Sequence, residues 1–333
     1  MKAEFWGVGD GSFFDYATVS KNRHIKYPML PAAMASKLGN SNLIRIQPKQ
    51  LGEIRLLSVD VALMSSRRNN NDATSIFINQ LMPTKSGRYT NNIVYCDVNE
   101  GWHTGDEALL VRRLYDEYQC DYIVLDANGV GLGVFDALVR DISDPETGEI
   151  YPALSCCNDP EMAMRCKSQG AEKVIWSVKA SAQMNSDCAV LLREGFRSGK
   201  IRLLVNEYDA EELLGECPGF TKLSDLDKMK LLLPYVNTTL LIDELVRLRH
   251  EESGGRIKIQ EGSGMRKDRY SSLSYSYYVA TQLEAKLNRR IWAEEAGADK
   301  FLYRAPKYSE RAVSEPGRQS TQRWGQRNTG NDW

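Results

Sequence analysis

The pattern of apolar and polar residues becomes regular from Arg55 onward. Three runs with the length and composition of β-strands follow one another at Arg55–Leu63, Thr74–Met82 and Asn92–Val98. The links between them are short, and the first, Ser65–Asp72, is polar. This pattern predicts an antiparallel meander of three strands.

Helical and strand-like spacings alternate after the meander. Helices are expected at Thr104–Gln119, at the apolar positions Val134, Leu138 and Ile142, and at Ala180–Phe196, Tyr208–Glu216, Val236–Glu252 and Lys267 to about Arg290. Strands are expected at Asp121–Asp126, Lys173–Val178, Lys200–Val205 and Arg256–Glu261. The order of the core elements, β-β-β-α-β-α-β-α, predicts an α/β fold with a mixed central sheet and flanking helices.

The regularity of the pattern also divides the chain. We expect residues 1–50 to be an irregular lead-in, residues 51–290 to form the main domain, and residues 291–333 to be a flexible polar tail. Glycines at 254, 255, 262 and 264 bracket Arg256–Glu261, which favours a hinged strand or hairpin there.

Composition narrows the class of protein. The 333 residues are 42% hydrophobic and 26% charged, as in soluble globular proteins, and the net charge of -1 argues against coating of DNA by bulk electrostatics. Seven cysteines contain no CxxC pair, which favours a reducing cytosol. The three histidines have no metal-ligand spacing, which argues against a zinc site, and no secretory or membrane-length apolar run occurs.

Three aspartates are candidates for chemistry. Asp60 lies within an apolar strand-like run, where acids are rare and burial of a carboxylate costs several kcal/mol unless it is compensated. Asp126 is the last residue of the strand-like run that follows the helix at Thr104–Gln119. In open α/β sheets, ligand sites lie at the carboxyl ends of the strands, which is where Asp126 falls. Asp126 also fits a turn acid before Gly129, and Asp268 also fits a first-turn acid of its helix.

Three converging carboxylates would suit phosphodiester hydrolysis. Two divalent ions about 3.5–4 Å apart activate water and neutralise the phosphate, and ligand sets made only of oxygen favour Mg²⁺ or Mn²⁺. Asp72 is a candidate to support the metal ligands from behind, or it is an ordinary turn acid. Arg266, Lys267 and Arg269 are candidate DNA contacts or solvated charges.

The segments Leu57–Ala62, Val124–Gly131 and Lys267–Leu273 together resemble the C-terminal nuclease part of tailed-phage (prophage) terminase large subunits. The resemblance covers roughly Arg55–Leu283 and implies an RNase H-like (retroviral-integrase-like) fold. It implies that Asp60, Asp126 and Asp268 hold the metals, and that the protein is a hydrolase that cuts concatemeric double-stranded viral DNA during packaging. Some members carry a histidine three residues before the last acid, where this chain has Met265, so that residue's role is not transferred.

The resemblance also sets expectations for partners and location. Double-stranded DNA is the expected substrate, and the portal protein and small terminase subunit are further partners that the family suggests. We expect no membrane contact, a monomeric isolated domain and a place in the cytoplasm of the bacterial host. The lead-in resembles the linker that joins the family's motor to its nuclease, but no GxxxxGK[ST] phosphate loop for an ATPase motor occurs in this chain.

Three alternatives stay open at this stage. Gly129–Gly133 follows a strand and invites a dinucleotide-binding interpretation, although Asp126 would repel a pyrophosphate. A transposase or junction resolvase shares the logic of three acids. A non-catalytic module that binds DNA or portal would use the arginine-containing segment Pro306–Trp333, with Trp324, as a partner-binding tail.

Overall fold

The computed structural model describes residues 12–39, 42–62, 73–100, 102–261 and 267–298. Contacts group the chain into two units, Met1–Glu284 and Ala285–Trp333. The sheet, both hydrophobic cores and the candidate site belong to the first unit. The expected boundaries at residues 50 and 290 remain predictions.

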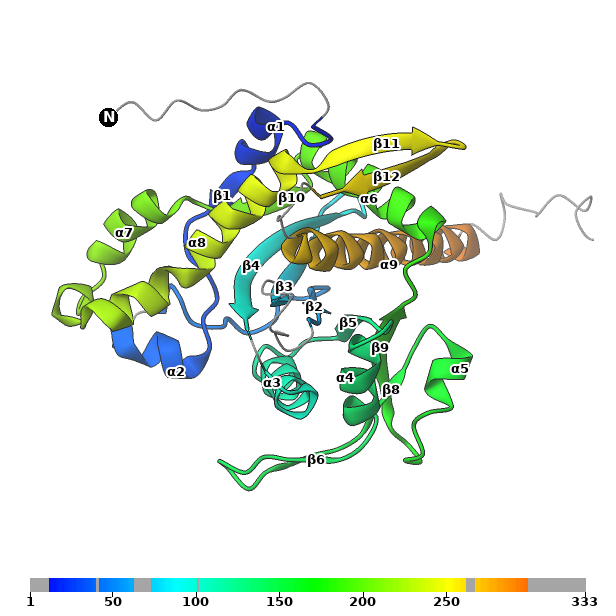
Figure 1. The fold of residues 1–333 in the computed structure, drawn as a ribbon, viewed down its shortest axis with the longest axis horizontal. Coiled ribbons are helices and arrows are strands. Elements are labelled where there is room, and N and C mark those ends of the chain that lie inside the picture. The colour runs from blue at the N-terminus through cyan, green and yellow to red at the C-terminus, as the bar shows by residue number, and fades with distance from the viewer. Residues whose placement is uncertain (1–11, 40–41, 63–72, 101, 262–266, 299–333) are drawn as a thin grey trace, which may run out of the picture. The chain divides into compact units, whose positions relative to one another are not determined.

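One eight-stranded sheet organises the described part of the first unit (Figure 1). The three central strands β2, β3 and β4 pair antiparallel, and every other pair in this sheet is parallel. The fold is therefore α/β, with a mixed sheet that contains the expected antiparallel meander. The strand order is β1 (Arg23–Ile25), β10 (Ile201–Leu204), β4 (Tyr89–Asn99), β3 (Thr74–Pro83), β2 (Ile54–Asp60), β5 (Tyr122–Asp126), β9 (Glu172–Val178) and β8 (Leu154–Cys156).

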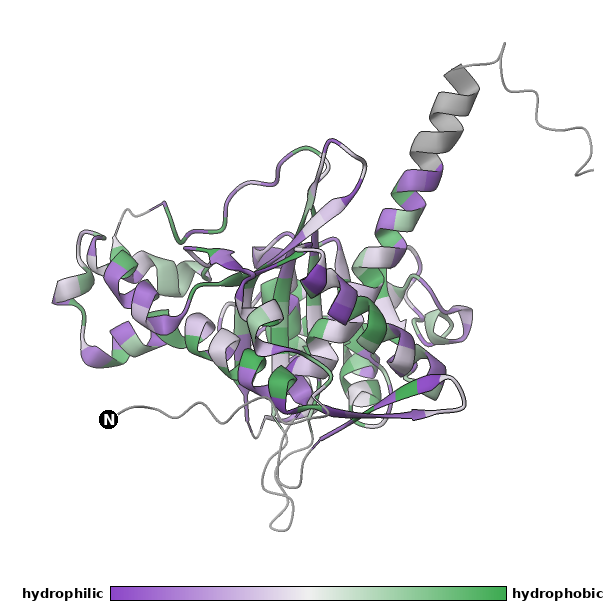
Figure 2. Ribbon diagram, turned by 90° about the horizontal axis from the view of Figure 1, so that it is seen from above, coloured by the Kyte–Doolittle hydropathy of each residue, from purple (hydrophilic) through white to green (hydrophobic). Residues whose placement is uncertain are grey.

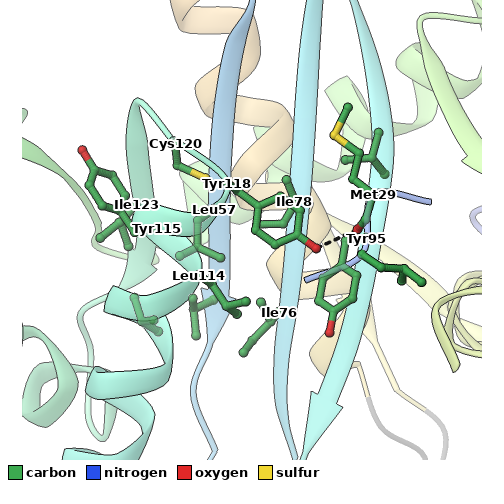
Figure 3. Close-up of a cluster of buried hydrophobic side chains, with 14 of the residues drawn as sticks. Met29, Leu57, Ile76, Ile78, Tyr95, Leu114, Tyr115, Tyr118, Cys120 and Ile123 are labelled. Carbon is green, nitrogen blue, oxygen red and sulfur yellow. Dashed lines mark hydrogen bonds between the residues drawn. The ribbon is translucent and has the colours of Figure 1, made fainter. Parts of the chain in front are cut away.

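Helices cover both faces of the sheet, because successive side chains of each central strand point to opposite sides and both sides are apolar. On one face, Leu57 and Ile76 pack with α3 (Thr104–Glu117) and α4 (Gly131–Leu138), as Figure 3 shows for α3. On the other face, Phe77 packs with α6 (Ala182–Arg197), α8 (Asp225–Arg247) and the start of α9 (Asp268–Ala298). Hydropathy colouring shows apolar residues gathered along the central strands (Figure 2).

The lead-in is more ordered than predicted over residues 12–50. It contains α1 (Tyr16–Ser20), α2 (Ala32–Ala35) and a 3₁₀ turn at Ser36–Leu38 in addition to β1, which adds a strand to the sheet. Phe14 is buried against Phe196 and Tyr270. Its apolar residues have no sustained spacing from which these elements could be predicted. Its aromatic residues, such as Phe14, instead pack it into the core formed with α6, α8 and the start of α9.

Smaller elements complete the unit. They are the hairpin of β6 (Ile142–Ser143) and β7 (Ile150–Tyr151), α5 (Pro160–Ala163), α7 (Glu207–Gly215), a 3₁₀ turn at Phe220–Lys222, and the hairpin of β11 (Arg249–Ser253) and β12 (Arg256–Gln260). No described helix is long and apolar enough to cross a membrane.

Two predicted helices are wrong in extent. The helix through Val134 ends at Leu138, and Ile142 lies in β6. The helix expected at Val236–Glu252 instead begins at Asp225, runs through Pro234 and ends at Arg247. Residues 249–253 pair with β12, because Gly254 and Gly255 take positive φ and close a two-residue turn.

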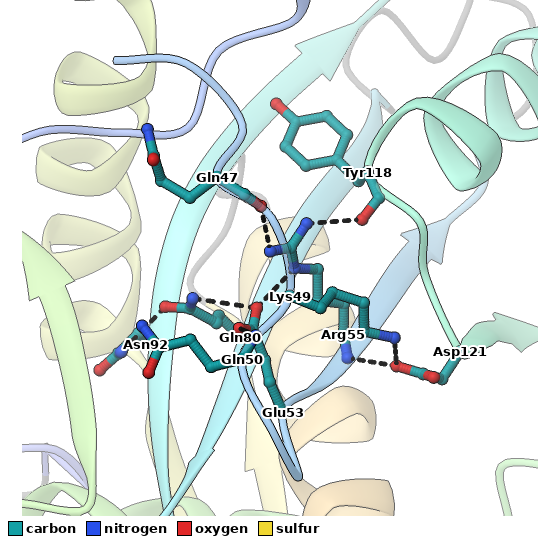
Figure 4. Close-up of polar contacts among 9 residues, drawn as sticks. All are labelled: Gln47, Lys49, Gln50, Glu53, Arg55, Gln80, Asn92, Tyr118 and Asp121. Atoms are coloured by element: carbon teal, nitrogen blue, oxygen red, sulfur yellow. Dashed lines mark hydrogen bonds and ion pairs between the residues drawn. The ribbon is translucent and has the colours of Figure 1, made fainter. Parts of the chain in front are cut away.

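A buried ion pair anchors the start of β2 (Figure 4). Arg55 and Glu53 are both buried, and the guanidinium Nε lies 2.6 Å from the carboxylate Oε1. Arg55 also donates to the carbonyl oxygens of Tyr118 at 3.0 Å and Gln47 at 2.6 Å. Since Gln80 donates to the same Glu53 oxygen at 3.0 Å, the network ties β2 to β3 and to the end of α3.

Candidate metal centre

Asp60 and Asp126 end two neighbouring parallel strands. The register pairs Ser58 with Val124 and Val59 with Leu125, so the next positions along β2 and β5 are Asp60 and Asp126. Neighbouring strands lie about 4.8 Å apart and in-register side chains share a face. The structure thus brings these two predicted residues together at the carboxyl edge of the sheet, with Asp60 at the end of β2 and not within it.

Asp268 approaches the same edge from the other side of β2. In the antiparallel register Asp60 lies opposite Ser75, and the backbone N–H of Ala73, two residues earlier, donates to Asp268 Oδ2 at 3.2 Å. Asp268 is the first residue of α9. Two chain segments about 200 residues apart therefore meet beside Asp60.

Serine contacts seat the first turns of α9 on β2. Ser58 Oγ donates to the carbonyl oxygen of Ser272 at 2.7 Å, and the two hydroxyls lie 3.1 Å apart. Because Ser58 and Asp60 point to the same face, Asp60 faces α9 as well. The Ser271 side chain hydrogen-bonds to Asp60.

The electrostatics agree with this convergence. Burial, the charge of Asp268 and the charge of Asp126, in that order, raise the pKa of Asp60 well above its usual range. Burial also raises the pKa of Asp126, against a hydrogen bond from the Asn128 N–H at 3.0 Å. On α9, burial and then the charges of Asp126 and Asp60 raise the pKa of Tyr275.

A fourth acid, Glu244 of α8, lies near the three aspartates. It is buried, its pKa is raised to about 7 chiefly by burial, and its charge contributes to the raised pKa of Asp60. The sequence does carry a signal for it, since Glu244 falls at helical spacing from the buried Leu241 and Leu248.

The donor set suits a hard divalent cation. Carboxylate oxygens are the ligands that such cations prefer, and the charges of Asp268 and Asp126 raise the cost of ionising Asp60 unless positive charge is added. Among the described residues, no three acids, histidines or cysteines stand in a metal-binding cluster. The residue types at this edge suit a cation, but the described side chains are not arranged as a coordination shell.

The predicted DNA-contact residues have different surroundings. Lys267 is partly exposed and lies 3.6 Å from Glu261. Arg269 is turned inward: Nη1 lies 3.5 Å from Glu244 Oε2, and Nη2 donates to Asn237 Oδ1 at 3.3 Å. Asp72 and Arg266 lie outside the described residues.

A cavity of about 530 Å³ adjoins the acids. It lies between α6, the β11–β12 hairpin and α9, and Ser271, which hydrogen-bonds to Asp60, is part of its wall. The cations of Arg256, Lys258 and Lys267 also line it. A cavity lined in part by basic residues thus lies next to the acidic edge of the sheet.

The glycines of the Gly129–Gly133 segment have structural roles. Gly129 takes a φ of +56°, in the region that favours glycine. A Cβ on Gly131 would lie 1.8 Å from the backbone oxygen of Asp126, so only glycine fits there. These roles account for two of the three glycines that suggested dinucleotide binding.

No protein-family model and no curated protein sequence matches the chain. The matching solved structures include nuclease domains of phage large terminases. The magnesium-bound nuclease of thermophilic phage G20c is 14% identical, with a TM-score of 0.42, over 80% of this chain and 97% of that one. The nuclease domain of gp2 from bacterial virus Sf6 is 11% identical, with a TM-score of 0.40, over 83% and 98%. A mutant Sf6 domain with manganese is 10% identical, with a TM-score of 0.38, over 81% and 97%.

Proposed function

We propose that this chain is a metal-dependent DNA endonuclease of the terminase kind, in which Asp60, Asp126 and Asp268 hold Mg²⁺ or Mn²⁺. The observation that carries the proposal is the register of β2 with its two neighbours. On one side, it sets Asp60 next to Asp126. On the other side, Asp60 lies opposite Ser75, two residues after Ala73, whose backbone N–H donates to Asp268. Three acids from distant parts of the sequence then face one edge of the sheet.

The bound ions would supply an activated water, neutralise the phosphate and stabilise the leaving alkoxide. The chain's own residues supply the frame for this chemistry. Asp60 and Asp126 stand on paired strands, which limits their movement, and the Ser271 side chain orients Asp60 through a hydrogen bond. Rigid strands hold such ligands more accurately than loops do.

The basic cavity supports a nucleic-acid substrate. Arg256, Lys258 and Lys267 provide positive charge beside the acids, and the chain as a whole is nearly neutral, so phosphate attraction is local. We assign phosphate contact to Lys267 among the described candidates, and we assign Arg269 to its partners Glu244 and Asn237. Asp72 and Arg266 remain proposals from the sequence.

We further propose that the substrate is concatemeric double-stranded viral DNA in the cytoplasm of the bacterial host, cut by two-metal hydrolysis. The portal protein and small terminase subunit are the proposed partners, as the resemblance of the sequence to terminase large subunits implies.

A plasmid-nicking assay tests the function. The wild type and Asp60→Asn, Asp126→Asn and Asp268→Asn are incubated with supercoiled DNA in Mg²⁺, Mn²⁺ or chelator. We expect metal-dependent cutting by the wild type and loss of it in each variant. Asp136→Asn is the matched control, because Asp136 is a partly exposed acid of α4 that pairs with Arg165.

Each alternative predicts a different result. Strand-transfer products or cuts confined to branched junctions would favour a transposase or a resolvase. A wild type that binds DNA but never cuts it in either metal would favour the non-catalytic module.

A further inference from the structure

An arginine directly follows the last of the three acids. Arg269 comes after Asp268 in the first turn of α9, and a guanidinium at that place is a natural counter-ion for a group of carboxylates. Its contacts lie elsewhere: the side chain is only 13% exposed and is directed to Glu244 and Asn237 of α8. Glu244 is more deeply buried, with a side chain that is 6% exposed.

Glu244 also binds the backbone of the same turn. Its Oε1 accepts the N–H of Tyr270 at 2.7 Å. The first N–H groups of a helix have no partner within the helix, and an acid at this end interacts favourably with the helix dipole. One carboxylate therefore fixes both the backbone and the arginine beside Asp268.

We propose that Glu244 is a positioning residue that holds Arg269 toward α8, so that the arginine does not act as counter-ion to the acidic site and the site keeps its negative charge for divalent ions. The inference rests on the proposed function. Glu244 contacts the first turn of α9 and the side chain of Arg269. It does not bind the cations itself, and it affects them only through these two contacts and through its own negative charge.

Binding of Mn²⁺ to the full chain, measured by isothermal titration calorimetry, tests this role. Glu244→Gln keeps the size of the side chain and an acceptor for the Tyr270 N–H but removes the charge that holds Arg269. We expect it to weaken Mn²⁺ binding at least about tenfold, the lower end of the usual effect of residues behind metal ligands. The double variant Glu244→Gln with Arg269→Gln should recover to within about threefold of the wild type, since the competing cation is gone.

A purely structural role predicts the opposite for the double variant, because a second lost contact would weaken binding further. Glu53→Gln is the matched control: Glu53 is also buried and paired with an arginine, but at the other end of β2, and its replacement should leave Mn²⁺ binding unchanged. Wild-type affinity in Glu244→Gln, or no recovery in the double variant, overturns the inference alone. A wild type that binds no Mn²⁺ overturns the proposed function and this inference with it.

Discussion

Gly131→Ala should disable the candidate site through the backbone of Asp126. Gly131 begins α4, five residues after Asp126, and an added Cβ would lie 1.8 Å from the Asp126 backbone oxygen. Real Cβ contacts essentially never fall below 3.0 Å. The atoms must therefore separate by at least 1.2 Å, the difference between these two distances.

This displacement acts on a proposed metal ligand. A misplacement of about 1 Å costs about 100-fold in rate when it disturbs reacting groups. Overpacking in a well-packed region costs about 1–3 kcal/mol of folding stability. We expect the variant to fold, to unfold at lower urea concentration than the wild type, and to lose about 100-fold of its nicking rate.

The assay is nicking in Mn²⁺ beside urea denaturation followed by circular dichroism. Gly105→Ala is the matched control, since Gly105 lies in the first turn of α3 and an added Cβ meets nothing within 4 Å. Replacing that glycine should leave nicking unchanged and stabilise α3 by up to about 1 kcal/mol. Full nicking by Gly131→Ala would refute the link between this glycine and the position of Asp126.

Three further predictions concern charge and packing. Arg55→Met should destabilise the fold by about 3–5 kcal/mol in urea denaturation, because it leaves Glu53 buried and unpaired. Adding Glu53→Gln should restore part of the lost stability. Equal stability of the wild type and Arg55→Met would contradict this prediction. In chelator, Asp60→Asn should melt above the wild type at pH 8 and converge with it near pH 4. Because the pKa of Asp60 is higher in the folded state than in the unfolded state, the folded state holds this proton more tightly, and the destabilisation by Asp60 grows as pH rises above the unfolded pKa. A constant difference across this range would refute that cause. Gly195→Ala should destabilise the packing of α6 on α9, because the Cβ would lie 2.5 Å from Tyr277, and Tyr277→Phe alone should not relieve it, since ring carbons also lie within 3.0 Å.

The central strands were predictable because each carries its own signal. The meander and the strand ending at Asp126 are long apolar runs with polar borders, and β5 ends at Asp126 as expected. The sequence predicts Asp60 inside its strand, whereas the structure ends β2 at that residue. The apolar run of the sequence continues to Leu63, but the pairing of β2 with β3 ends at Asp60 and its pairing with β5 ends at Val59.

Long-range pairing and tertiary packing account for what the sequence did not predict. Pro234 looks like a helix boundary because it lacks an N–H, but Leu231 and Tyr235 on either side are buried and keep α8 continuous. Glu244 lies in both the predicted and the observed helix, but its nearness to the aspartates depends on the packing of α8 against the start of α9. The sequence predicts Arg269 as a candidate DNA contact because it flanks the last acid. In the structure its side chain contacts Glu244 and Asn237 of α8, about 25–32 residues earlier, which only tertiary packing could reveal.

The central claim is that Asp60, Asp126 and Asp268 together hold divalent ions. Calorimetric titration of Mn²⁺ into the wild type and into the three single Asp→Asn variants tests it most directly. The account predicts saturable binding by the wild type and its loss in every variant, with each variant still folded by circular dichroism. Wild-type binding in any one of the three would contradict the account and remove that aspartate from the site.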